Sequence, residues 1–173
     1  MLRSISILHS LFLFPGPFMI RKCFYSKRCT LEVKFAPLVN TVEATIVKVQ
    51  VIDGSWPDHL QGKVIARTVS IEIGDIVLLD SRDGRMSITC VGEIKLSRNV
   101  VFVELSGQLK VGVVVDNRSN VVVKDMALFT PLKASFSHGT CDLGFCKVEI
   151  TVAWFLLATL ADMHSLSIFR SGS

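Results

Sequence analysis

The stretch from residue 146 to residue 154 reads CKVEITVAW and decides the fold. Its apolar side chains stand at every second position, and the positions between them carry Lys147, Glu149, Thr151 and Ala153. Successive side chains of a β-strand point to opposite faces of the sheet, so a period of two indicates a strand with one buried face. The stretch therefore predicts a strand that contributes to the core through Cys146, Val148, Ile150, Val152 and Trp154.

The same alternation recurs earlier in the chain. Two shorter segments, Val101–Leu105 and Lys110–Val115, show it clearly. A longer β-branched run, Val42–Ile52, changes its apolar phase near Val47. An extra residue in one strand moves the following side chains to the opposite face, so a β-bulge near Val47, or burial on both faces, would explain this change.

Turn signals separate these apolar runs at short intervals. They combine Gly, which adopts positive φ angles, with Asp, Asn or Ser, whose side chains hydrogen-bond nearby backbone groups. Residues 80–84, between Ile76–Leu79 and Met86–Thr89, predict a hairpin. Short strands at this spacing, with no sustained helical stripe, indicate a sandwich or barrel, and we expect an all-β fold, an antiparallel β-sandwich.

Charge is distributed unevenly along the 173 residues. The net charge is +4, but five basic residues precede Glu32, the first acidic residue. The rest of the chain has 14 basic and 15 acidic side chains, a net charge of −1. A nucleic-acid-binding face needs concentrated Lys and Arg to neutralise phosphates, so no nucleic-acid partner is expected.

The two ends of the chain differ from its body. Residues 1–29 form an apolar and basic leader, which fits a secretory signal, an organelle transit peptide or an unstructured start with no targeting role. Pro15-Gly16-Pro17 interrupts its apolar run, and Val152–Ala161 is too short, so no transmembrane span is expected. We expect the sandwich to occupy residues 30–157 and a polar tail to follow at residues 158–173.

His138, Cys141 and Cys146 form the sharpest metal candidate. Histidine and thiolate are the ligands that zinc prefers, but a structural zinc site needs four of them and no second pair is present. Cys146 is also in phase with the buried face of its strand, where a thiol packs as a small apolar group. The odd number of cysteines, five, does not indicate a disulfide framework.

Acidic turn residues form a second candidate site, for calcium. If the segments 86–90 and 93–96 are separate antiparallel strands, the loops with the carboxylates fall at one end of the sandwich. Clustered carboxylates on loops can bind calcium through oxygen ligands, although Asp is also a common turn residue. The candidate ligands are Asp53, Asp58, Asp80, Asp83 and Asp116.

Catalytic patterns are missing from the sequence. It has no GxSxG, P-loop, HExxH or dinucleotide fingerprint, and Cys141 with His138 has no evident orienting third group. We therefore expect no enzymatic activity and no cofactor. Trp56, before Pro57, is the candidate partner-binding residue, for a protein or a sugar, although such a ring more often covers the end of the core.

Several segments resemble a family of plant domains of unknown function, family 6598, which is expanded in grasses and cereals. The matching segments include VIDGSWPD (residues 51–58), IVLLDSRDGRM (76–86), FTPLKA (129–134) and LGFCKVEITVAW (143–154). Together with shorter ones they cover most of residues 28–157. The resemblance implies a β-sandwich module without an assigned activity. It also implies that this chain corresponds to the C-terminal half of the family's domain, so the sandwich would be incomplete relative to it.

The leading functional hypothesis is a non-enzymatic plant module that binds a partner, which we expect to be a protein. Some related cereal chains join such a domain to a ribosome-inactivating N-glycosidase, which implies a stress or defence role. One alternative is thus an accessory domain of proteins of that kind. Another is calcium- or sugar-dependent recognition at the Asp-rich loops.

Overall fold

The computed structural model describes residues 20–35, 38, 40–69, 74–81, 85–117 and 120–156. These residues form ten strands and no helix, which confirms the all-β fold class. The chain divides into two compact units, Met1–Pro37 and Leu38–Ser173. The strands are β1 Ile20–Tyr25, β2 Thr30–Phe35, β3 Thr41–Gly54, β4 Gln61–Thr68, β5 Ile76–Asp80, β6 Val100–Glu104, β7 Leu109–Asn117, β8 Asn120–Phe129, β9 Ala134–Asp142 and β10 Cys146–Leu156.

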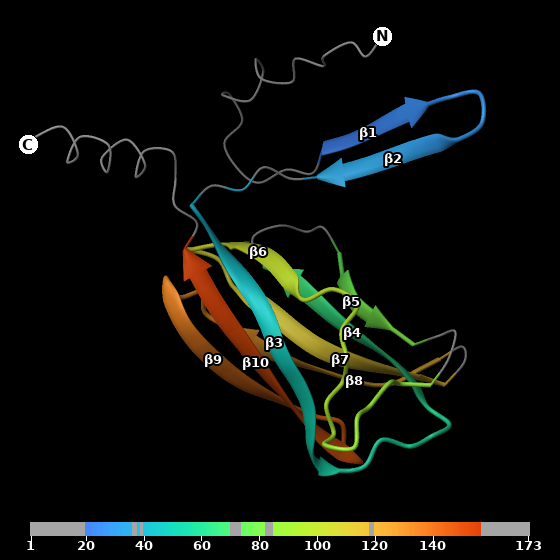
Figure 1. Ribbon diagram of the computed structural model, residues 1–173, viewed down its shortest axis with the longest axis vertical. Coiled ribbons are helices and arrows are strands. Elements are labelled where there is room, and N and C mark those ends of the chain that lie inside the picture. The colour runs from blue at the N-terminus through green and yellow to red at the C-terminus, as the bar shows by residue number, and fades with distance from the viewer. Residues whose placement is uncertain are drawn as a thin grey trace, which may run out of the picture. The chain divides into compact units, whose positions relative to one another are not determined.

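The second unit is an antiparallel sandwich, as the turn spacing predicts. One sheet has the strand order β6-β3-β10-β9 and the other has the order β5-β4-β7-β8. Figure 1 shows the two sheets stacked face to face rather than closed into a barrel. The hairpins β4–β5, β7–β8 and β9–β10 pair within a sheet, whereas the other connections cross between the sheets.

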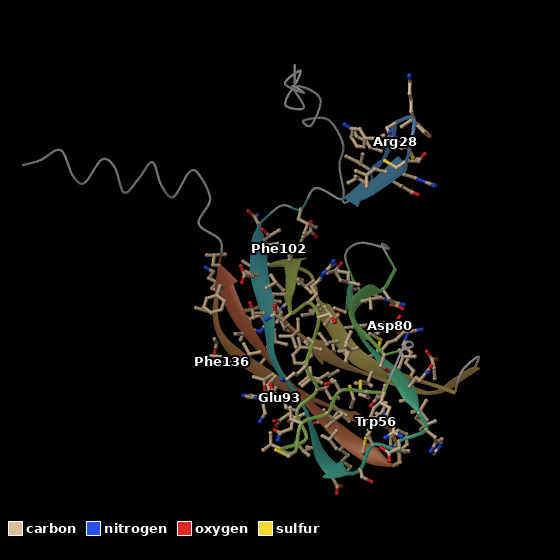
Figure 2. The ribbon with its side chains drawn as sticks, turned by 45° about the vertical axis from the view of Figure 1, so that its right-hand side comes forward. Arg28, Trp56, Asp80, Glu93, Phe102 and Phe136 are labelled. Atoms are coloured by element: carbon tan, nitrogen blue, oxygen red, sulfur yellow. The ribbon has the colours of Figure 1, made fainter. Side chains whose placement is uncertain are left out.

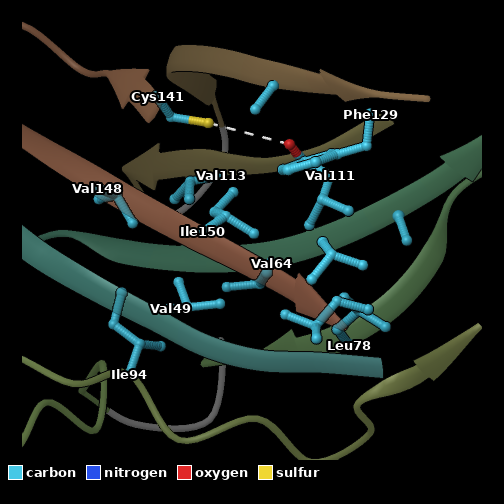
Figure 3. Packing of buried hydrophobic residues seen from close by; sticks show 14 of the residues in the cluster. Val49, Val64, Leu78, Ile94, Val111, Val113, Phe129, Cys141, Val148 and Ile150 are labelled. Atoms are coloured by element: carbon cyan, nitrogen blue, oxygen red, sulfur yellow. Dashed lines mark hydrogen bonds between the residues drawn. The ribbon is translucent and has the colours of Figure 1, made fainter. Parts of the chain in front are cut away.

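The core lies between the inner faces of the two sheets. Val49 and Ile150 from one sheet meet Val64, Val111 and their neighbours from the other, and all of these side chains are at most 2% exposed (Figure 3). The predicted inward residues of β10 are all buried, from Cys146 to Trp154. The strand assignment that rests on the two-residue period is therefore confirmed. On the other face Lys147 is exposed and Glu149 is half-buried, but Thr151 and Ala153 are buried as well, so the prediction of a single buried face holds only for the first half of the strand.

β3 contains the predicted bulge. Its register against β10 shifts so that Ile46 pairs with Val152 and Lys48 with Thr151, which leaves Val47 as the extra residue. Val47 is exposed, while Ile46 and Val49 on either side of the shift are buried. The bulge thus returns the apolar side chains that follow it to the core.

The hairpin predicted between Ile76–Leu79 and Met86–Thr89 is wrong. β5 pairs with β4, and its Leu78 carbonyl accepts hydrogen bonds from the backbone amides of Ser97 and Arg98. Ile88 instead forms an isolated bridge with Ile94. The two segments are close in sequence, but the backbone groups of β5 form their hydrogen bonds with β4 and with residues 97–98 instead.

The first unit contains a hairpin of its own, in which Ile20–Tyr25 pairs with Thr30–Phe35 over six residues of each strand. The expected domain boundary near Thr30 differs from this division, because β2 pairs with β1 inside the unit that ends at Pro37. The expectations for residues 1–19 and for the tail after Leu156 lie outside the described residues. No helix in the described ranges is long and apolar enough to cross a membrane.

Candidate functional site

The four described acidic residues that were singled out for calcium lie at one end of the sandwich but are not arranged as a metal site. Asp80 and Asp116 flank the start of β4, opposite Lys63 and Gln61 respectively, whereas Asp53 ends β3 in the other sheet. The Asp116 carboxylate forms an ion pair with the Lys63 ammonium, with 3.0 Å between Oδ2 and Nζ. Within the described ranges, no three His, Cys, Asp or Glu side chains converge on a metal position. Asp58 is exposed in the β3–β4 loop, and Asp83 lies outside the described residues.

The three candidate zinc ligands, His138, Cys141 and Cys146, do not lie on the same face of their sheet. His138 and Cys141 are three residues apart on one strand, so their side chains point to opposite faces. The Cys141 thiol is buried in the core, while the His138 imidazole is exposed on the outer face, where its Nδ1 lies 3.1 Å from Thr151 Oγ1. The spacing that resembles a zinc motif in sequence therefore does not bring these ligands together.

Burial makes the two core thiols poor nucleophiles. Burial raises the pKa of the Cys141 thiol to about 11, and it raises the pKa of the Cys146 thiol, with a further rise from the nearby Asp142 carboxylate. A raised pKa keeps the thiol protonated at neutral pH, and the thiolate is the reactive form. Cys23, Cys29 and Cys90 are by contrast exposed.

We expect a thiol-alkylating reagent at pH 8 to modify the three exposed cysteines of the native protein and to spare Cys141 and Cys146. Intact mass spectrometry would show three adducts on the folded chain and five after unfolding, because unfolding removes the burial that protects the remaining two. Rapid native labelling of Cys141 would show that β9 does not seal this side of the core.

Trp56 covers the loop end of the core, which is the second of the two roles that the sequence suggests for this ring. Its indole Nε1 donates a hydrogen bond to the Leu60 carbonyl at 3.1 Å, and its ring packs edge-on against Phe145 with 5.8 Å between the ring centroids. The ring also lies over Gly62, where an added Cβ would come within 2.8 Å of it. The indole is therefore held in one orientation, and its half-buried ring contributes to a groove at this end. Trp56 is labelled in Figure 2.

The groove has a volume of about 480 Å³ and runs between two segments that are far apart in sequence. Trp56, Asp58 and Leu60 line it from the β3–β4 loop, and residues 85, 86 and 88–92 line it from the long β5–β6 connection. Apolar side chains from Met86 and Ile88 join the indole in its wall. Sequence reasoning identified Trp56 but missed residues 85–92, because they were assigned to a hairpin strand.

The 85–92 wall is fixed to β3 by a tight turn. The Glu93 amide donates to Thr89 Oγ1 at 3.0 Å, and the Gly92 amide donates to the Thr89 carbonyl at 2.9 Å. The Val51 amide and the Gln50 side-chain amide then donate to the Gly92 and Val91 carbonyls at 2.9 and 2.6 Å. Hydrogen bonds on both walls thus hold the groove in a preformed shape.

A second aromatic surface lies on the outer face of the sheet that contains β10. Glu43 on β3 pairs with both Phe102 and Phe155, and Ala153 pairs with Phe136 one row further along. Phe102, Phe155 and Phe136 are 47%, 53% and 62% exposed, and Figure 2 labels Phe102 and Phe136. This surface lies on a sheet face rather than in a groove, and sequence reasoning missed it because each ring occurs singly in its own strand.

Together these features define an antiparallel β-sandwich domain with a preformed groove at its loop end. The chain belongs to the family described as domain of unknown function DUF6598, whose family model matches residues 10–152. The match covers the β1–β2 hairpin and the sandwich as far as Val152 within β10. No curated protein matches the chain. No solved structure matches it either.

Proposed function

We propose that this DUF6598 chain is a non-enzymatic module that holds a short segment of a partner protein in the Trp56 groove. The observation that carries the proposal is the groove itself, which is concave, aromatic and fixed by hydrogen bonds on both walls. Preformed concave sites bind more tightly than flexible ones, since little conformational freedom is lost on binding. The resemblance to cereal chains fused to an N-glycosidase supports a stress or defence role for this binding.

The composition of the groove favours a peptide over other ligands. Trp56, Leu60, Met86 and Ile88 offer an apolar floor for one or two side chains, and tryptophan is among the residues most often dominant in protein interfaces. Arg85 and Asp58 are exposed at the groove and can pair with charged groups of either sign on the partner. The described lining contains one thiol, Cys90, and no histidine beside it.

Selection of a random-peptide library against the full chain tests this proposal. We expect the selected peptides to bind the Trp56→Ala variant about 30-fold more weakly, because truncating a central aromatic side chain typically removes about 2 kcal/mol of binding free energy. Alkylation of Cys90, which lines the groove, should slow when the peptide is bound.

Two further variants separate binding from folding. Arg85→Ala removes an exposed groove side chain without touching the core, so a loss of affinity in this variant cannot arise from unfolding. Phe136→Ala is the matched control, an exposed aromatic residue on the outer sheet face away from the groove lining. Peptides whose affinity depends on Phe136 and not on Trp56 would place the binding surface on the sheet face and contradict the groove.

A further inference from the structure

The hairpin of the first unit has two chemically different faces. The register pairs Phe24 with Leu31 and Lys22 with Val33. Alternation along the strands therefore puts Ile20, Lys22, Phe24, Leu31 and Val33 on one face, which is apolar apart from Lys22. The other face carries Arg21, Cys23, Tyr25, Thr30 and Glu32. Phe24 and Leu31 are 45% and 58% exposed, and Tyr25 is 80% exposed. The apolar face thus presents large side chains to solvent next to the turn.

The turn of this hairpin has two basic side chains, Lys27 and Arg28, at its tip. Ser26 Oγ donates to the Cys29 carbonyl at 3.1 Å and accepts from the Arg28 and Cys29 amides at 3.3 and 3.1 Å. The Ser26 amide adds a fourth bond, to the Cys29 carbonyl at 2.9 Å. These bonds leave the exposed Lys27 and Arg28 as the two central turn residues, and Figure 2 shows Arg28 at the tip.

Positive charge is concentrated in this unit of the chain. Residues 20–35 contain five basic side chains and one acidic side chain, Glu32, which forms an ion pair with Arg21. The rest of the chain after Glu32 has no such excess of basic residues. An anionic surface would therefore attract the hairpin far more strongly than the sandwich.

We propose that the β1–β2 hairpin binds the surface of an anionic lipid bilayer, with Lys27 and Arg28 at the headgroups and Phe24 and Leu31 inserted beside them. Surface-bound peripheral segments gain free energy from buried apolar area and from attraction to anionic lipids, and this hairpin offers both at one end. A tyrosine near the turn suits the membrane interface, where its ring is apolar and its hydroxyl stays hydrated. An isolated two-stranded hairpin is only marginally stable in water, so covering its apolar face would also stabilise it.

Nucleic acid fits the hairpin less well than a membrane does. Binding to a single strand would use aromatic rings and cations on the same face, where bases stack and phosphates pair. Here Phe24 and Lys22 share their face with Leu31 and Val33, and these aliphatic side chains have no counterpart on a phosphate backbone. The aliphatic side chains beside the cationic turn therefore favour lipid.

Vesicle sedimentation with the full chain tests the proposal. We expect binding to vesicles of equal parts phosphatidylserine and phosphatidylcholine, weakening at high salt, and little binding to phosphatidylcholine alone. The double variant Lys27→Gln, Arg28→Gln should bind about 30-fold more weakly, since each basic side chain near an anionic surface contributes about 1 kcal/mol. The double variant Phe24→Ser, Leu31→Ser should lose about tenfold or more through lost apolar burial.

Matched controls lie on the sandwich. Lys95→Gln with Lys133→Gln removes two exposed cations, and Leu128→Ser removes an exposed apolar side chain, so neither should change vesicle binding. The proposal fails if anionic vesicles do not bind, if the control variants weaken binding equally, or if a single-stranded oligonucleotide binds in preference to vesicles. It also fails if the hairpin variants lower the melting temperature and leave vesicle binding unchanged, since the apolar face would then be packed within the chain. Peptide binding in the Trp56 groove should be unaffected by the hairpin variants, so the two proposals succeed or fail separately.

Discussion

Replacing Trp154 with alanine is expected to lower the free energy of unfolding by about 3–5 kcal/mol, the range typical of large aromatic truncations in cores. Trp154 lies on the central strand β10, is 1% exposed and donates its indole Nε1 to Ser137 Oγ at 2.9 Å. The substitution leaves a cavity in the core. It also removes the hydrogen bond that links β10 to the Ser137 hydroxyl on β9. Chemical denaturation followed by circular dichroism would measure the change.

The next residue along the strand supplies the control for this prediction. Phe155 has a similarly large side chain but points to the outer face and is 53% exposed. Phe155→Ala should therefore cost no more than about 1 kcal/mol, as surface substitutions do. A Phe155→Ala effect as large as that of Trp154→Ala would mean that the two-residue period of β10 does not mark one buried face.

The parts of the fold that follow from local pattern could be predicted from sequence. The buried face of β10 and the bulge at Val47 both depend on side-chain parity along a single strand, and parity is visible in the sequence. The partner of β5 was not predictable in this way, since both Ile76–Leu79 and Met86–Thr89 contain apolar side chains and a turn signal stands between them. Long-range pairing with β4 decided the outcome.

The candidate site shows the same limit more strongly. Trp56 could be identified as an unusual loop residue, but the opposite wall of its groove lies about 30 positions later in the chain. The zinc-like spacing of His138 and Cys141 failed for a local reason, because three residues along a strand reverse the side-chain direction. The β1–β2 hairpin was missed because its basic residues resemble a targeting leader, although Thr30–Phe35 alternates polar and apolar residues as a strand does.

Gly54→Ala is the second substitution with a large expected effect, about 3 kcal/mol lost from the free energy of unfolding. Gly54 ends β3 with a φ of 71°, and a Cβ there would lie 2.2 Å from the Phe145 carbonyl oxygen. A left-handed φ costs about 1–2 kcal/mol for a residue with a Cβ. The backbone clash adds to this cost, since relieving it must move the corner where β3 meets β10, and overpacking of this kind typically costs about 1–3 kcal/mol.

Gly144→Ala separates the two contributions to the Gly54 effect. Gly144 lies in the β9–β10 turn at the same end of the sandwich, with a φ of 81°, but a Cβ at this position would meet no atom within 4 Å. This variant should therefore lose only the cost of the left-handed φ, about 1–2 kcal/mol. Urea denaturation midpoints for both variants would give the difference, which isolates the clash with Phe145. Equal losses would show that the Phe145 carbonyl can move away freely, and the corner beside the Trp56 groove would then be less rigid than the hydrogen bonds of its walls imply.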